Sequence, residues 1–349
     1  MLKLTTGNLL DANTDALVNT VNTVGIMGKG IALQFRLAFP RNYELYQSAC
    51  KREEVVPGKM FVVPTDRLDN PRFIINFPTK RHWKGKSRIE DIDSGLLDLV
   101  KVIREEKINS IAVPPLGCGN GGLDWNQVRP RILKALADLP AVQVLLYQPA
   151  GAPPVEDLAV GTKRPGMNSN RAALIAMMLD YGEVGYHLTL LEIQKLAYFL
   201  QLAGQPLKLD FQKQQYGPYA ETLNHPLQRM EGHFIRGYGD RNRDASIRIL
   251  PEAAQEVGRF LADDESTVKR IERVRDLIEG FETPYGMELL ATVHWAALEC
   301  AATRDDVDRV VATVHAWNER KAATFTPKHI RTAYEQLCAL GWLPKSIDT

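Results

Sequence analysis

The segment FPTKRHWKGKSR, residues 77–88, brings together side chains that could act on an anionic ligand. Lys80 lies just after the apolar run RFIINF, which is typical of a buried strand. A lysine that lies among other cations and is partly removed from water has a lowered pKa, so its neutral amine is available as a nucleophile. The segment therefore predicts a reactive lysine, with a solvated surface lysine as the alternative.

The rest of this segment could hold a nucleic-acid strand. Cationic side chains neutralise phosphates, and an aromatic ring stacks on an unpaired base. The residues with these properties are Arg81, His82, Trp83, Lys84, Lys86 and Arg88. An ordinary basic loop in contact with water is the alternative interpretation.

Two glycine-rich loops suggest a second chemistry, the binding of a pyrophosphate. In VNTVNTVGIMGKGIALQF (residues 18–35) and in VPPLGCGNGGLDW (residues 113–125), an apolar strand leads through glycines into a helix. Glycines let backbone N–H groups approach a ligand, and the start of a helix favours negative charge. Neither loop matches the Walker pattern or GxGxxG, and Lys29 is not followed by Ser or Thr, so nucleotide triphosphate hydrolysis is poorly supported.

The elements that must position these loops alternate along residues 1–150. Short apolar runs typical of strands are separated by helical patterns, for example near residues 89–106 and 125–139. Such alternation predicts an α/β fold with a mostly parallel mixed sheet, and ligands bind such sheets at the carboxyl ends of the strands.

A linker and a second domain are predicted after this region. Residues 151–168 are rich in Pro, Gly and Ala and show no hydrophobic period. Residues 169–349 are predicted to be mainly α-helical, with one small β-hairpin formed by the two arms of HFIRGYGDRNRDASIRIL. Ser169 is the expected N-cap of the first helix, and a second helix is expected in residues 189–204. Further helices are expected at roughly 252–261, 265–281, 285–302, 305–320 and 327–340.

Composition limits the classes of function. The formal net charge is +1, but residues 1–150 carry 20 Lys and Arg against 15 Asp and Glu, whereas residues 151–349 carry 23 against 27. An anionic ligand is therefore expected on the first domain. Four scattered cysteines and seven histidines without metal-ligand spacing predict neither disulfides nor a metal, and no cofactor is expected. Without a signal peptide or membrane span in the sequence, we expect a cytoplasmic protein.

Several motifs in residues 1–150 together resemble a macrodomain, the three-layer α/β/α fold that binds ADP-ribose. These motifs are GNLLDANTDALVNTVNTVGIMGKGIALQF, PGKMFV, LGCGNGGL and the terminal strand VLLYQ. The resemblance implies that Asn22 contacts the distal ribose and that both glycine loops embrace the pyrophosphate. It places Asn8 where many macrodomains have an Asp that binds adenine, and Tyr147 could pack against adenine or belong to the core. The implied ADP-ribose-binding residues are Asn8, Leu9, Asn22, Gly28, Lys29, Gly30, Ile31, Gly117, Cys118, Gly119, Asn120, Gly121, Gly122, Leu123 and Tyr147.

Lys80 narrows the resemblance to the terminal-ADP-ribose glycohydrolase branch and to its bacterial relatives, the DarG family. In the human-type branch an Asp stands where this chain has Gly121, and Asp124 is either a substitute or a cap of the next helix. The DarG resemblance implies that Lys80 is the catalytic residue in removing ADP-ribose from a DNA base, with thymidine the expected base. A protein-directed ADP-ribosyl hydrolase and a non-catalytic ADP-ribose reader are the alternatives.

The second domain contains a pattern that resembles Panacea-type antitoxin domains. It is the QKLAYF…YGP pattern within residues 189–223. The resemblance implies that this domain binds a DarT-type ADP-ribosyltransferase toxin. Acidic groups at residues 263–265 and 305–308 suggest mimicry of nucleic acid, although acidic residues also favour helix starts.

Overall fold

The computed structural model describes the chain except for residues 68, 150–158, 184–187, 239–245, 301–305 and 344–349. The chain forms two compact units, Met1–Lys163 and Arg164–Thr349. Residues 151–158 of the predicted linker lie outside the described residues, whereas residues 159–168 are described. In the part of the chain that is described, no helix has both the length and the apolar character needed to cross a membrane.

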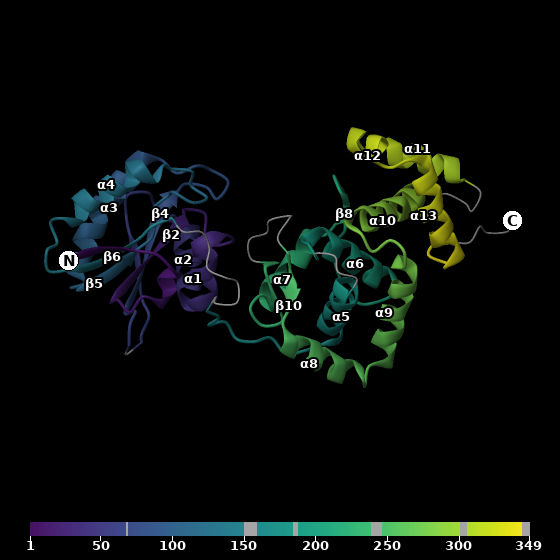
Figure 1. Cartoon of the computed structure of the whole chain (residues 1–349), viewed down its shortest axis with the longest axis horizontal. Coiled ribbons are helices and arrows are strands. Elements are labelled where there is room, and N and C mark those ends of the chain that lie inside the picture. Colours follow the sequence, from purple (N-terminus) through teal and green to yellow (C-terminus); the bar gives the residue numbers. More distant parts are fainter. Residues whose placement is uncertain (68, 150–158, 184–187, 239–245, 301–305, 344–349) are drawn as a thin grey trace. The chain divides into compact units, whose positions relative to one another are not determined.

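The first unit is built on a six-stranded sheet (Figure 1). Its strand order is β1-β6-β5-β2-β4-β3, and every neighbouring pair is parallel except β3 with β4. This arrangement confirms the predicted mostly parallel mixed sheet. The strands are β1 (Leu2–Thr5), β2 (Ala16–Asn22), β3 (Phe61–Pro64), β4 (Phe73–Lys80), β5 (Ser110–Val113) and β6 (Gln143–Tyr147).

Helices cover both faces of this sheet, as the α/β/α resemblance implies (Figure 1). Along β2 the side chains alternate: Ala16 and Val18 pack in the cluster of α3 and α4, whereas Leu17 packs with Phe35 of α1. This period of two follows from the pleat of a strand. The helices are α1 (Gly30–Ala38), α2 (Pro40–Lys51), α3 (Ile89–Glu105) and α4 (Trp125–Leu136), and a short 3-10 turn, η1, spans Leu9–Asp11.

Two elements of this unit were not predicted. The strand β1 has four residues and pairs only with β6 on the edge of the sheet, so its sequence carries little apolar signal. The helix α2 begins at Pro40, a residue favoured in the first turn of a helix, but it presents mostly polar side chains. Three buried asparagines attach it to the sheet: Asn76 donates to Asn42 (2.7 Å) and accepts from Asn19 (3.0 Å).

The second unit is mainly helical, as predicted. The predicted hairpin forms as β9 paired with β10, and its polar turn, residues 239–245, lies outside the described residues. A second antiparallel pair, β7 with β8, was not predicted; its turn is Gln215–Tyr216, and Gly217 and Pro218 of the YGP pattern belong to β8. The elements are α5 (Ser169–Glu183), α6 (Leu190–Leu202), β7 (Gln212–Gln214), β8 (Gly217–Tyr219), η3 (Glu221–Leu223), α7 (Asn224–Met230), β9 (Ile235–Arg236), β10 (Arg248–Ile249), α8 (Pro251–Leu261), α9 (Glu265–Ile278), α10 (Pro284–Glu299), α11 (Val307–His315), α12 (Glu319–Thr324) and α13 (Pro327–Ala339).

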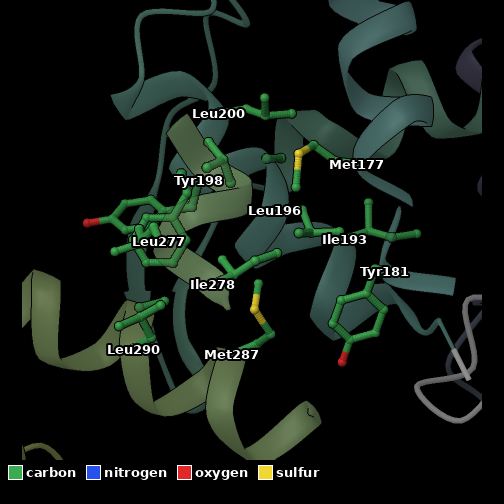
Figure 2. Packing of buried hydrophobic residues seen from close by; sticks show 14 of the residues in the cluster. Met177, Tyr181, Ile193, Leu196, Tyr198, Leu200, Leu277, Ile278, Met287 and Leu290 are labelled. Carbon is green, nitrogen blue, oxygen red and sulfur yellow. The ribbon is translucent and has the colours of Figure 1, made fainter. Parts of the chain in front are cut away.

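The single helix predicted for residues 305–320 is two helices, α11 and α12. Asn318 separates them because its side chain accepts a hydrogen bond from the Lys321 N–H and so caps α12. The core of the unit lies between α5, α6, α9 and α10, where aromatic, aliphatic and methionine side chains interdigitate (Figure 2). Within it, the Tyr198 hydroxyl lies 2.8 Å from His294 Nδ1, so a buried hydroxyl and a buried imidazole satisfy each other.

Candidate active site

The predicted site residues of the first unit follow the carboxyl ends of five parallel strands. The neighbouring strands β5 and β2 are the centre of this arrangement. After β2 the chain enters α1 on one face of the sheet, whereas after β5 it enters α4 on the other face. Adjacent strands whose following helices cover opposite faces leave room for a ligand between their loops. The two glycine loops stand at this position.

Lys80 is the last residue of β4 and points toward the second glycine loop. Its Nζ donates a hydrogen bond to the backbone carbonyl of Asn120. Burial lowers the pKa of the Lys80 amine below the usual value of a lysine. The reactive lysine that the sequence predicts is therefore half-buried, and it is attached to a loop that is 40 residues away in the chain.

The two glycine loops approach each other. A Cβ placed on Gly30 would lie 3.1 Å from the side-chain nitrogen of Asn120. Gly30 also has a φ of +56°, which L side chains rarely adopt. Position 30 therefore needs glycine both for its backbone conformation and for the close approach of the opposite loop.

Gly121, where the resemblance to the human-type branch implies an Asp, has no room for a side chain. A Cβ there would lie 2.2 Å from the Gly117 carbonyl oxygen and 2.3 Å from Ser87 Oγ. The Ser87 N–H donates to the Gly121 carbonyl at 2.9 Å, which fixes the segment before α3 to this loop. An aspartate at position 121 is incompatible with this packing.

Asn22, the predicted ribose contact, shapes the first glycine loop. Its side-chain nitrogen donates to the Ile26 carbonyl at 2.5 Å, and its side-chain oxygen accepts from the N–H of Val24 at 3.0 Å. The Tyr46 hydroxyl donates to its backbone carbonyl at 2.5 Å. The ribose contact stays a prediction, and the structure adds a role in holding the loop for this side chain.

The basic segment after β4 is exposed, apart from the half-buried Gly85 and the buried Ser87. Trp83 is 45% exposed, lies 5.6 Å from the His82 ring between centroids, and has the Lys84 amine 4.8 Å from its ring centroid. Lys86 and Arg88 are also exposed. Exposed rings and cations of this kind are able to contact a single strand, and binding of DNA by this segment stays a prediction.

Arg81 differs from the other cations of the segment. Its guanidinium forms an ion pair with the buried Asp91 carboxylate of α3, with 3.0 Å between Nη2 and Oδ1. The Thr23 hydroxyl donates to the Arg81 carbonyl at 2.7 Å. Arg81 therefore joins the ends of β2 and β4 to α3, and its expected contact with DNA must compete with the Asp91 carboxylate.

The adenine-binding residues implied by the resemblance lie at the β1 edge. Asn8 caps the turn η1, accepting from the Leu10 N–H at 3.1 Å and donating to the Asp11 carboxylate at 3.1 Å. Tyr147 ends β6, directly opposite Thr5 of β1. Burial raises the pKa of the Tyr147 hydroxyl, and the nearby Asp11 raises it further.

The alternative that the sequence leaves open for Asp124 is decided by geometry, and burial limits the reactivity of the nearby Cys118. The Asp124 carboxylate accepts from the Asn126 N–H at 2.9 Å and is the N-cap of α4, so it is occupied as a helix cap. Burial, with a smaller contribution from Asp124, raises the pKa of the Cys118 thiol to about 11. A thiol with that pKa is a poor nucleophile at neutral pH.

The QK and YGP patterns of the second unit contact each other. Gln194 donates to the Ala220 carbonyl (3.0 Å) and accepts from its N–H (2.9 Å), while the Lys195 amine donates to the Pro218 carbonyl (2.7 Å). Lys195 is 1% exposed, and burial, together with the nearby Lys321, lowers its pKa to about 7. The pattern thus fixes the β7–β8 hairpin on α6.

The acidic groups of the second unit also make structural contacts. Asp264 caps α9 by accepting from the Thr267 N–H at 3.1 Å, and Asp308 forms an ion pair with Arg331. Asp305 lies outside the described residues. Asp264 is therefore explained as a helix cap, and Asp308 has an internal partner.

Sequence reasoning missed four residues of the first site: Thr23, Asp91, Asp11 and Ser87. Thr23 and Ser87 stand inside the motifs but carry no charge or ring that would attract notice. Asp91 looked like an ordinary acid in the first turn of a helix.

In the described residues no group of three His, Cys, Asp or Glu side chains is placed to hold a metal ion.

Comparisons with known proteins show what this chain is similar to. The family model "Macro domain" matches residues 18–132. A curated relative from Thermus aquaticus, "DNA ADP-ribosyl glycohydrolase", is 50% identical over 343 residues, 98% of this chain and 94% of the relative. A "DNA ADP-ribosyl transferase-DNA ADP-ribosyl glycohydrolase fusion protein" from Thermosipho africanus is 37% identical over 163 residues, 42% of each chain. The solved macrodomain of Mycobacterium tuberculosis DarG is 57% identical and aligns with a TM-score of 0.43, covering 43% of this chain and 99% of that one.

The relative from Thermus aquaticus extends over almost the whole of both chains, so the similarity includes the second unit as well as the macrodomain. The chain belongs to the DarG family of DNA ADP-ribosyl glycohydrolases.

Proposed function

We propose that this protein hydrolyses the N-glycosidic bond between ADP-ribose and a DNA base, thymidine being the expected base, and that it thereby acts as an antitoxin in the cytoplasm. The observation that carries the proposal is the position of Lys80, whose half-buried amine meets the second glycine loop beside the end of β2. Membership of the DarG family supports the choice of substrate.

The order of the strands determines how ADP-ribose would lie along the edge of the sheet. From β1 through β6, β5 and β2 to β4 there are four intervals, which at the usual strand spacing amount to about 19 Å. Adenine would lie at the β1 edge near Asn8 and Tyr147, the pyrophosphate between the glycine loops, and the distal ribose near Asn22. This orientation brings the anomeric carbon, which carries the base, to Lys80.

The low pKa of Lys80 suggests how the bond is cleaved. The neutral amine attacks the anomeric carbon, the C–N bond to the base breaks, and its electron pair leaves with the base, which takes up a proton. Water then hydrolyses the bond between ribose and Lys80, releasing ADP-ribose and restoring the amine. Opening of the ribose ring would make the covalent species a Schiff base. Glycine loops that hold the pyrophosphate keep the sugar in place throughout both steps.

The second unit is proposed to bind the toxin itself, an ADP-ribosyltransferase of the DarT type. The Thermosipho africanus relative joins a transferase and a glycohydrolase in one chain, which is consistent with the two proteins working together. Two activities would then oppose the toxin: removal of its product by the first unit and direct binding by the second.

Replacing Lys80 by alanine should separate binding from catalysis. The variant Lys80→Ala is expected to bind ADP-ribose with unchanged affinity by calorimetry, because the glycine loops remain. Its rate of ADP-ribose release from modified single-stranded DNA should fall by about 10²–10⁴-fold, since the nucleophile is lost. A Lys101→Ala variant, altered in the exposed part of α3, is the control. Release at the wild-type rate by Lys80→Ala would refute the catalytic role.

The pH dependence of the reaction should follow the Lys80 amine. Burial lowers its pKa, so the reactive neutral form persists to lower pH than in a free lysine. We expect kcat/KM to be constant above this pKa and to fall tenfold per pH unit below it, as the amine becomes protonated. A rate that instead falls as the pH rises would mean that the protonated lysine is the active form.

Charge reversal in the basic segment should affect DNA more than a small substrate. For the double variant Lys84→Glu and Lys86→Glu, kcat/KM on modified DNA should decrease, and the slope of its logarithm against log salt should become shallower by about two. Activity on an ADP-ribosylated nucleoside should change little. The matched control reverses Lys101 and Lys134, exposed cations of α3 and α4. Equal losses on both substrates would contradict a contact with the strand.

Toxin binding should persist without catalysis. Full-length Lys80→Ala, mixed in equimolar amount with the transferase, is expected to slow DNA ADP-ribosylation as strongly as the wild-type chain. The initial rate of transfer is the measurement, and bovine serum albumin is the protein control. If Lys80→Ala gives no inhibition, neutralisation is entirely enzymatic and the binding proposal is wrong. A complex whose stability is the same at low and high salt would argue against acidic mimicry.

A further inference from the structure

Ser87 is a buried polar side chain of the first unit that the proposed mechanism does not use. It is 7% exposed, and its hydroxyl oxygen is enclosed without a hydrogen-bond partner in the described residues. Its backbone N–H, in contrast, donates to the Gly121 carbonyl at 2.9 Å. The main chain of Ser87 therefore has a structural role, while its hydroxyl has none that the free protein accounts for.

The hydroxyl is directed into the second glycine loop. Ser87 Oγ would lie 2.3 Å from a Cβ on Gly121 and 3.1 Å from a Cβ on Gly117. Glycine at both positions is what allows the hydroxyl to lie there. At these two positions the loop faces the hydroxyl with main chain alone, so no side chain of residue 117 or 121 stands between the hydroxyl and the loop.

The same loop has unused donors beside the hydroxyl. The N–H groups of Gly119, Asn120 and Gly121 form no hydrogen bond with a described residue, whereas those of Cys118, Gly122 and Leu123 do. Successive free N–H groups in a glycine-rich turn form a concave site for an anion. A buried hydroxyl without a partner destabilises the free protein, so its presence at this place calls for a partner in the bound state.

We propose that Ser87 is a substrate-binding residue, whose hydroxyl donates a hydrogen bond to a phosphate oxygen of the ADP-ribosyl group. The proposal rests on the proposed function, in which the pyrophosphate lies between the two glycine loops. Ser87 adds a side-chain donor to the backbone donors of the second loop. It thereby helps to hold the distal ribose against Lys80, whose amine bonds to the same loop at the Asn120 carbonyl.

The experiment compares stability and ligand affinity in the variant Ser87→Ala. Without ligand, the variant should unfold at the same or a higher denaturant concentration than the wild type, because an unpaired buried hydroxyl is removed. Its Kd for free ADP-ribose, measured by calorimetry, should rise about tenfold, which corresponds to about 1.4 kcal/mol. Ser87→Cys, with a weaker donor of similar shape, should have an intermediate Kd.

Ser94→Ala is the matched control, since the Ser94 hydroxyl lies in α3 and already donates to the Glu90 carbonyl at 2.9 Å. Its Kd for ADP-ribose should equal that of the wild type. An unchanged Kd in Ser87→Ala overturns the proposal, and so does a loss of stability that accompanies the loss of affinity, because Ser87 would then act on the fold. Free ADP-ribose is the probe, so a protein that binds it normally but does not cleave modified DNA would refute the proposed function and not this assignment.

Discussion

Parallel pairing of β2 with a neighbour on each side is the constraint on which the site depends. β2 pairs with β4 along its whole length, but with β5 only at Ala16 and Leu17. Beyond that point the two strands no longer bond to each other, and each runs on into its own glycine loop. Because the strands are parallel, both loops and Lys80 lie at one edge of the sheet. Because the β2–β5 pairing ends early, the two glycine loops are not held in an extended conformation by hydrogen bonds between these strands.

The parts of this site that could be predicted from sequence are those encoded locally. Glycines between a strand and a helix, a lysine directly after an apolar run, and the acid that caps α4 are all short-range signals. Contacts across the sheet have no such signal. The Lys80 bond to Asn120 spans 40 residues and the Thr23 bond to Arg81 spans 58, so neither can be read from spacing. Ser87 was missed for the same reason. Its hydroxyl can lie against the second glycine loop only because Gly117 and Gly121 carry no side chain.

The second unit shows how a functional pattern can consist of structural contacts. Gln194 and Lys195 hold the β7–β8 hairpin, and Lys321, also fully buried, bonds to Glu288 at 2.7 Å and to Thr292 at 2.9 Å. Burial lowers the pKa of both lysines, and repulsion from Lys321 contributes to the lowered pKa of Lys195. The Glu288 carboxylate opposes both shifts but does not cancel them. A pattern that resembles a toxin-binding domain therefore specifies its hairpin, and the surface of the proposed toxin contact has to be sought among exposed residues.

The glycine at position 121 and the lowered pKa of the Lys80 amine are related, because position 121 brings no carboxylate to the second glycine loop. Burial is the cause of the lowered Lys80 pKa, and no carboxylate of the described residues opposes it, since Asp91 pairs with Arg81 and Asp124 caps α4. An aspartate at position 121 would clash with the Gly117 carbonyl, and its charge would raise the pKa of a neighbouring amine. Glycine at this position thus serves the loop and the lysine together: it admits the close packing around Ser87, and it leaves Lys80 able to lose its proton. In the proposed mechanism, this arrangement keeps the neutral form of the Lys80 amine available as the nucleophile.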